Sequence, residues 1–216
     1  HWHLELPLQY VKWGLAGYTA TPGDSAYGMG DDRAYLNYVR DTDQSASRWD
    51  RLSSGQPAAI YFWYRQSPGP FNTRDVNIVN EYTPSRDFPG MTTVTLDTLG
   101  RLRSFYAVPP QKSTGVDPAT PADWSQLFAE AGLDQTKFQS VPSVWTPPHQ
   151  ATVRAAWDGF YADRPDIKLH VEAGAFEGKP VYFELLEPWD QPRTVVFGLA
   201  RFQQRRVRND SHVRLE

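Results

Sequence analysis

One run of five consecutive β-forming residues limits the possible folds of this chain more than any other feature. The run covers 60–64 and reads Ile-Tyr-Phe-Trp-Tyr, after a polar, turn-rich stretch at 40–56. Such a run beside turn signals is typical of a strand. Prolines then recur through 67–90, so we predict a long loop there, with at most one edge strand at 76–79.

Two further pairs of β-rich runs predict hairpins. In the first pair, the runs 92–96 and 101–108 flank a short turn that closes on Gly100. In the second pair, apolar and polar residues alternate over 167–173, and a β-rich run returns over 181–186. We expect the alternating strand to bury one face and to expose the other.

Short helices are predicted between these strands. Asp31 and Asp32 can cap a helix in which Tyr35, Tyr38 and Val39 share one apolar face. Apolar spacing and helix-start or helix-stop residues predict three more helices, over 7–16, 121–131 and 153–160. Strands and helices together indicate an α+β fold.

A Pro/Ser/Thr-rich stretch at 109–120 divides the chain near its midpoint. The order of predicted elements is similar on either side, and a Trp-Asp pair precedes a proline and a β-rich run in both halves. We therefore predict two related units, 1–108 and 121–200, each an antiparallel sheet with short helices packed on one face. A basic tail over 201–216 follows, and its last two residues resemble a vector-derived junction.

Composition excludes several classes of function. The chain has 22 Lys and Arg against 25 Asp and Glu, a net charge of −3, so no nucleic-acid partner is expected. It has no cysteine, which excludes disulfides, thiol catalysis and Cys-ligated zinc. No apolar run approaches the roughly 18 residues that a membrane-spanning helix needs.

Motifs for catalysis or cofactor binding are also missing. There is no Gly-x-Ser-x-Gly elbow, no His-Glu-x-x-His and no phosphate-binding loop, and Gly28 and Gly30 lack the third glycine of a dinucleotide site. We predict no cofactor and no metal site. A hydrolase would instead need two carboxylates near aromatic residues, and the candidates are Asp41, Asp158, Glu172 and Glu184. Glu172 falls on the polar side of the alternating strand, where a solvated acid is expected.

The aromatic strand supplies the candidate ligand-binding residues. Tyr61, Trp63 and Arg65 would share one face, and aromatic rings beside a guanidinium can hold a sugar, a peptide or a lipid headgroup. Tyr35 and Arg40 from the preceding helix join this candidate set. Burial of the strand within the core is the alternative interpretation.

Several short stretches carry a family resemblance. They are DSAYG at 24–28, YLNYV at 35–39, IYFWYRQSP at 60–68, LDTLGRL at 96–102 and GKPVYFE at 178–184. In these stretches the chain resembles the region that follows the kinase domain in multi-span bacterial Ser/Thr protein kinases of the acidobacterial type. The resemblance covers about 8–192, and a weaker likeness links the helix and hairpin to PepSY-type modules. The kinase signatures themselves are absent from the sequence.

The resemblance implies an extracytoplasmic, periplasmic sensor or binding module that signals to a kinase domain outside this chain. Such a module is not an enzyme in its own right, and its ligand would be a small molecule, a peptide or a protein. The alternative from another class is a structural or dimerising spacer that forms a homodimer. The carboxylate-dependent hydrolase is the third hypothesis.

Overall fold

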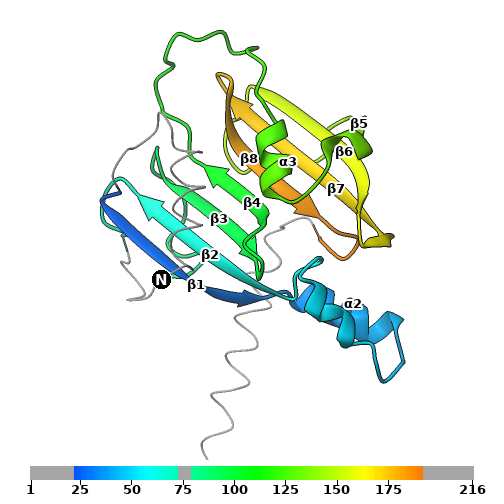
Figure 1. Cartoon of the computed structure of the whole chain (residues 1–216). Coiled ribbons are helices and arrows are strands. Elements are labelled where there is room, and N and C mark those ends of the chain that lie inside the picture. The colour runs from blue at the N-terminus through cyan, green and yellow to red at the C-terminus, as the bar shows by residue number, and fades with distance from the viewer. Residues whose placement is uncertain (1–21, 73–78, 192–216) are drawn as a thin grey trace, which may run out of the picture.

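The computed structural model describes residues 22–72 and 79–191, which form one open antiparallel sheet of eight strands with short helices (Figure 1). The strand order is β1-β2-β3-β4-β8-β7-β6-β5. The strands are β1 (Asp24–Asp31), β2 (Ile60–Ser67), β3 (Thr92–Asp97), β4 (Leu102–Ala107), β5 (Gln139–Val141), β6 (Val153–Tyr161), β7 (Arg164–Phe176) and β8 (Lys179–Leu186). The helices are α2 (Arg33–Thr42), α3 (Ser125–Glu130) and the 3₁₀ helices η1 (Asp50–Ser54) and η2 (Gln135–Lys137).

The prediction of two separate sheets is wrong, because the halves of the chain share one sheet. Each half is a four-stranded meander, and the last strands of the two meanders, β4 and β8, pair with one another. Three pairs of opposing residues join β4 to β8, and we call this junction the seam. Phe105 lies opposite Phe183 in the middle pair. Unpaired backbone groups at a strand edge favour such pairing. The antiparallel arrangement with short helices is confirmed, but the described residues form a mostly β fold with two short α-helices, where an α+β fold was predicted.

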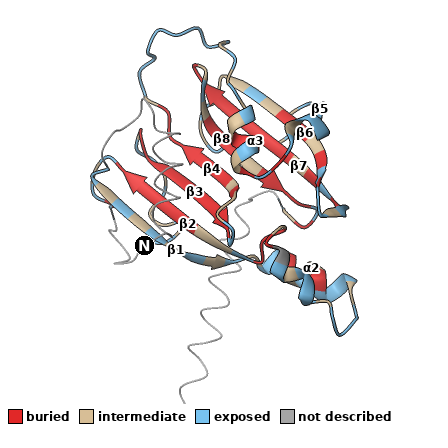
Figure 2. Ribbon diagram, in the orientation of Figure 1, coloured by how far each residue is buried: buried red, intermediate tan, exposed pale blue. Residues whose placement is uncertain are grey.

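One side of the sheet carries the main hydrophobic core, and we call it the apolar face. Val94, Phe105, Phe183 and Val171 occupy it on four neighbouring strands, and all are buried. Figure 2 shows that buried residues predominate along these strands, β3, β4, β8 and β7. Helix α3 covers this face in the second half, where Phe128 meets the ring of Phe183 edge-on at 5.8 Å.

The region 153–160 is strand β6, where a helix was predicted. The spacing of its apolar residues fits both the 3.6-residue period of a helix and the two-residue period of a strand. Pairing with β7 along its length makes it a strand, with Trp157 on the apolar face and Asp158 on the opposite side. Helix α3 begins at Ser125, later than its predicted start. The predicted helix over 7–16, most of the predicted edge strand and the tail 201–216 lie outside the described residues.

Other local predictions are confirmed. Strand β2 and both hairpins form where the sequence indicated, and Asp32 caps α2 through a hydrogen bond from the Tyr35 amide to its Oδ1 atom, at 2.9 Å. In the turn between β3 and β4, the buried Asp97 Oδ1 accepts hydrogen bonds from the amides of Leu99 and Arg101. These bonds explain why this short turn sets the register of the hairpin.

Helix α2 belongs to the first half of the chain but also contacts the second. The ring of Trp189, which follows β8, lies 4.7 Å from each of the rings of Tyr35 and Tyr38. Among the described helices, none combines the length and apolar character required to cross a bilayer.

Candidate functional site

Polar side chains line the centre of the sheet on the side opposite α3, which we call the polar face. The register aligns Thr95, Ser104, Glu184 and Glu172 across four neighbouring strands, from β3 to β7. Thr95, Ser104 and Glu172 are buried, although polar residues usually face solvent on the open side of an antiparallel sheet. Because α3 lies on the opposite face of the sheet, another part of the chain must cover these polar residues.

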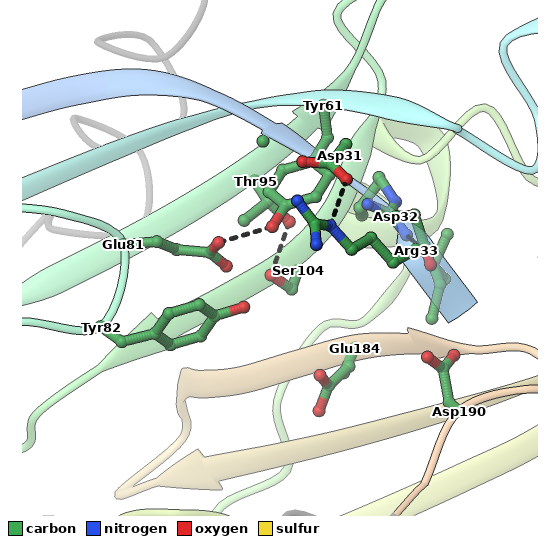
Figure 3. Close-up of a pocket in the computed structure, with 13 residues that line it drawn as sticks. Asp31, Asp32, Arg33, Tyr61, Glu81, Tyr82, Thr95, Ser104, Glu184 and Asp190 are labelled. Atoms are coloured by element: carbon green, nitrogen blue, oxygen red, sulfur yellow. Dashed lines mark hydrogen bonds and ion pairs between the residues drawn. The ribbon is translucent and has the colours of Figure 1, made fainter. Parts of the chain in front are cut away.

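Two adjoining cavities open over this face, with volumes of about 700 and about 600 Å³. They share Glu184 and Asp190, so we treat them as one site and call it the seam groove, because it lies over the β4–β8 seam. Figure 3 shows Glu81, Tyr82, Glu184 and Asp190 around the same space. Both halves of the chain thus contribute to a single groove.

Tyrosine hydroxyls contact carboxylates along the groove. The Tyr61 hydroxyl donates to Glu81 Oε2 at 2.6 Å, and the Tyr106 and Tyr182 hydroxyls donate to the two Glu184 oxygens at 2.6 and 2.8 Å. Burial, together with the neighbouring carboxylate, raises the pKa of Tyr61 and of Tyr182 above the ordinary tyrosine value. Both hydroxyls therefore stay protonated and keep each carboxylate in a fixed orientation.

Two arginines lie against these tyrosines. The Arg103 guanidinium sits 4.9 Å from the Tyr61 ring centre and donates to Asp32 Oδ2 at 2.9 Å. Arg103 lies where the β3–β4 register shifts, and such a bulge redirects a side chain. Arg86 is 4.3 Å from the ring centre of Tyr106. The ring faces of the groove therefore already hold cations of the chain itself.

An acidic pair, the buried Glu187 and the half-buried Asp190, adjoins the groove. The backbone amide of Glu187 donates to Asp190 Oδ2 at 2.7 Å, and the Tyr161 hydroxyl donates to Glu187 Oε1 at 2.6 Å. Burial raises the pKa of Glu187 to about 8, since the charge of Arg103 only partly opposes the effect and Asp190 adds to it. The pKa of Asp190 is raised by burial as well, so this pair of acids retains a proton at a higher pH than a free carboxyl group would.

One wall of the groove comes from the loop at 79–90, which Arg65 holds in place. Arg65 is 1% exposed and donates from Nη1 to the Asn80 carbonyl at 2.8 Å and from Nη2 to the Pro84 carbonyl at 2.6 Å. Burial and the charge of Arg86 lower the pKa of Arg65 to about 10. Arg65 thus positions Glu81 and Tyr82 above the sheet.

Glu172 holds the other wall, the loop at 143–148. Its carboxylate accepts hydrogen bonds from the amides of Val144 and Trp145 at 2.8 and 2.9 Å and from the Ser143 hydroxyl at 2.7 Å. His170 Nε2 lies 3.0 Å from the same group. The expectation of a solvated acid is wrong: Glu172 is fully buried because the loop folds over it.

The structure separates the five predicted ligand-binding residues. Tyr61, Trp63 and Arg65 share the polar face as predicted, but only Tyr61 lines the groove. Trp63 is buried against Gly28, where an added Cβ would come within 2.7 Å of its ring. On α2, Tyr35 is buried beside Trp189, whereas Arg40 is exposed and pairs with Asp41. Ligand binding by these residues stays a prediction.

The four candidate carboxylates are also only partly brought together. Glu172 and Glu184 are register partners on β7 and β8. Asp158 lies one strand further out, where it contacts His170 Nδ1 at 2.6 Å and Lys168 Nζ at 2.7 Å. Asp41 is exposed on α2, outside the groove.

Sequence reasoning missed Glu81, Tyr82, Tyr106 and Tyr182 as groove residues. A signal was available for the two strand residues, because each lies two positions from a polar residue of the same face, Ser104 or Glu184. No comparable period marks the loop residues Glu81 and Tyr82.

Comparisons with family models, with curated proteins and with solved structures give no match. Within 22–72 and 79–191, no group of three His, Asp or Glu side chains is arranged to hold a metal ion. The resemblance to the kinase-associated region therefore stays a prediction.

Proposed function

We propose that this chain is a ligand-binding module whose ligand occupies the seam groove. The observation that carries the proposal is that one cavity system is built by both halves of the sheet across a seam of only three register pairs. A concave site with convergent polar groups and aromatic walls is the usual form of a small-ligand or peptide site.

The position of the groove suggests how binding could be transmitted. A ligand that contacts Tyr61 and Tyr82 on one side and Glu184 and Asp190 on the other favours one arrangement of the halves. Such differential affinity is what couples a site to a conformational state. In agreement with the resemblance, we propose that this state is passed to a kinase from the extracytoplasmic side of a membrane. The kinase link rests on the resemblance, and the ligand site rests on the groove.

A thermal-shift screen tests the ligand site. The probes are peptidoglycan disaccharide-peptides, chitotriose and capped tripeptides of neutral, acidic and basic sequence. A ligand of the groove should raise the melting temperature of the wild type and should raise it less in Tyr82→Ala, because Tyr82 lines the cavity and is 42% exposed.

Hydrogen exchange then locates the effect. Bound ligand should slow exchange of the amides at the seam, at 104–106 and 182–184, and leave α3, on the opposite face of the sheet, unchanged. The proposal fails if no probe stabilises the protein, or if Tyr82→Ala responds to every probe as the wild type does. The dimerising-spacer alternative predicts instead a mass that rises with concentration in sedimentation equilibrium.

A further inference from the structure

We infer that the ligand of the seam groove is cationic: a flexible chain that carries at least two ammonium groups. This inference rests on the proposed function and names the class of ligand for the same site. Acids alone do not define a site, but here they line a cavity of about 700 Å³ whose walls include aromatic rings. The charges of the lining residues, the positions of the tyrosine rings and the direction of the hydrogen bonds to the carboxylates all favour a cationic ligand.

The charges lining the larger cavity are mainly negative. Five of its lining residues are acidic, and two are arginines. Both arginines are in ion pairs within the lining itself: Arg33 Nε lies 3.0 Å from Asp31 Oδ2, and Arg103 Nη2 lies 2.9 Å from Asp32 Oδ2. The smaller cavity adds no basic residue to its lining. An anionic ligand would therefore meet repulsion along the groove.

The carboxylates at Glu81 and Glu184 are oriented by neutral donors. Tyrosine hydroxyls bond one oxygen of Glu81 and both oxygens of Glu184. A carboxylate oxygen can accept more than one hydrogen bond, so Glu81 can accept one from an ammonium group of a ligand besides that from Tyr61, whereas Glu184, already bonded by two tyrosines, contributes to the acidic lining. Charge-assisted bonds of this kind are among the stronger ones in proteins.

Aromatic rings lie beside both carboxylates. Tyr61 is next to Glu81, and the Tyr106 and Tyr182 rings, with centres 5.6 Å apart, flank Glu184. Carboxylate and ring face together suit a cation, because the ring quadrupole adds to the ionic attraction. Arg103 and Arg86 already lie over the Tyr61 and Tyr106 rings, so among these three rings it is that of Tyr182, beside Glu184, that is offered to a ligand cation. With one carboxylate on a loop of the first half and the other on β8, a ligand with two separated ammonium groups can contact both.

Isothermal titration calorimetry tests the inference with two kinds of flexible molecule that carry several ammonium groups. Spermidine represents a free polyamine, and capped trilysine represents a basic peptide segment; capped triglutamine and triglutamate are the neutral and acidic controls. We expect at least one cationic probe to bind, with an affinity that falls as salt rises, and neither control to bind. The cationic probe that binds with the lower Kd shows whether the groove takes a free polyamine or a basic peptide segment.

Charge-removing variants locate the binding. Glu81→Gln and Glu184→Gln should each raise the Kd of the cationic probe about tenfold, whereas Asp41→Asn, which removes the same charge on exposed α2, should not change it. Unchanged melting temperatures would show that the variants fold. The cationic assignment is overturned if neither cationic probe binds, if binding is unaffected by both glutamate variants, or if triglutamine binds equally well. Binding of triglutamine or chitotriose that Tyr82→Ala weakens would keep the groove as a ligand site while removing its cationic assignment.

Discussion

The two faces of the sheet are closed by different kinds of interaction. On the apolar face, Phe128 of α3 packs edge-on against Trp157 and Phe183, at 5.1 and 5.8 Å between ring centres. On the polar face, loops cover the strands and are fixed by hydrogen bonds to buried ionisable residues, Arg65 and Glu172. Apolar contact is not directional, whereas a buried charge needs a complete set of partners. The apolar face therefore supplies stability, and the polar face holds a groove in a defined shape.

The largest effect is expected on the apolar face. Phe183→Ala removes a fully buried ring at the seam and should lower the free energy of unfolding by about 3–5 kcal/mol. Urea denaturation measures the change, and Phe160→Ala, whose ring is 52% exposed, is the control with little expected loss. A loss below about 1 kcal/mol at Phe183 would contradict the assignment of the core to this face.

The next effect is a pH dependence beside the polar groove. Because the pKa of Glu187 is raised from 4.5 to about 8 on folding, the folded state holds a proton that the unfolded state releases. Stability should fall as pH rises from about 4.5 to about 8, by roughly 2–3 kcal/mol between about pH 5.5 and about pH 7.5 from this group. Glu187→Gln should remove that component in denaturation curves measured across the range. Parallel profiles for the two proteins would show that Glu187 is ionised in the folded state.

A smaller, local effect is expected at the loop over Glu172. Glu172→Gln keeps the shape but removes the charge and one acceptor oxygen, so it should cost about 2 kcal/mol. Faster hydrogen exchange should appear at the amides of Val144 and Trp145, which donate to this carboxylate. Asp41→Asn, an exposed acid, should leave both stability and exchange unchanged. Unchanged exchange at the Val144 and Trp145 amides would instead show that the Glu172 carboxylate does not hold this loop.

The smallest effect is expected at Arg65. Arg65→Lys keeps a cation but loses the planar pair of donors that reaches Asn80 and Pro84, which should cost about 1 kcal/mol. Limited proteolysis should cut the 79–90 loop sooner than in the wild type. The matched change Arg40→Lys on exposed α2 should behave as the wild type. Equal cleavage rates for Arg65→Lys and the wild type would mean that other contacts hold the loop.

Local patterns in the sequence determined much of the secondary structure. The aromatic run at 60–64, the turn at Asp97 and the cap at Asp32 were predicted because a few neighbouring residues settle each of them. Strand β6 was missed because its apolar residues fit both a helical and an extended period, and pairing with β7 made the choice.

Tertiary structure alone decided how the halves join and which polar residues meet. Nothing local in β4 or β8 specifies that each strand pairs with the other, so one continuous sheet replaced the two that were predicted. Glu172 was expected to be solvated and Arg65 to bind a ligand, yet loops outside their strands supply the hydrogen bonds that bury them. The chain encodes its strands through short-range preferences, but the groove depends on contacts between residues far apart in sequence, and these form only when the sheet is complete.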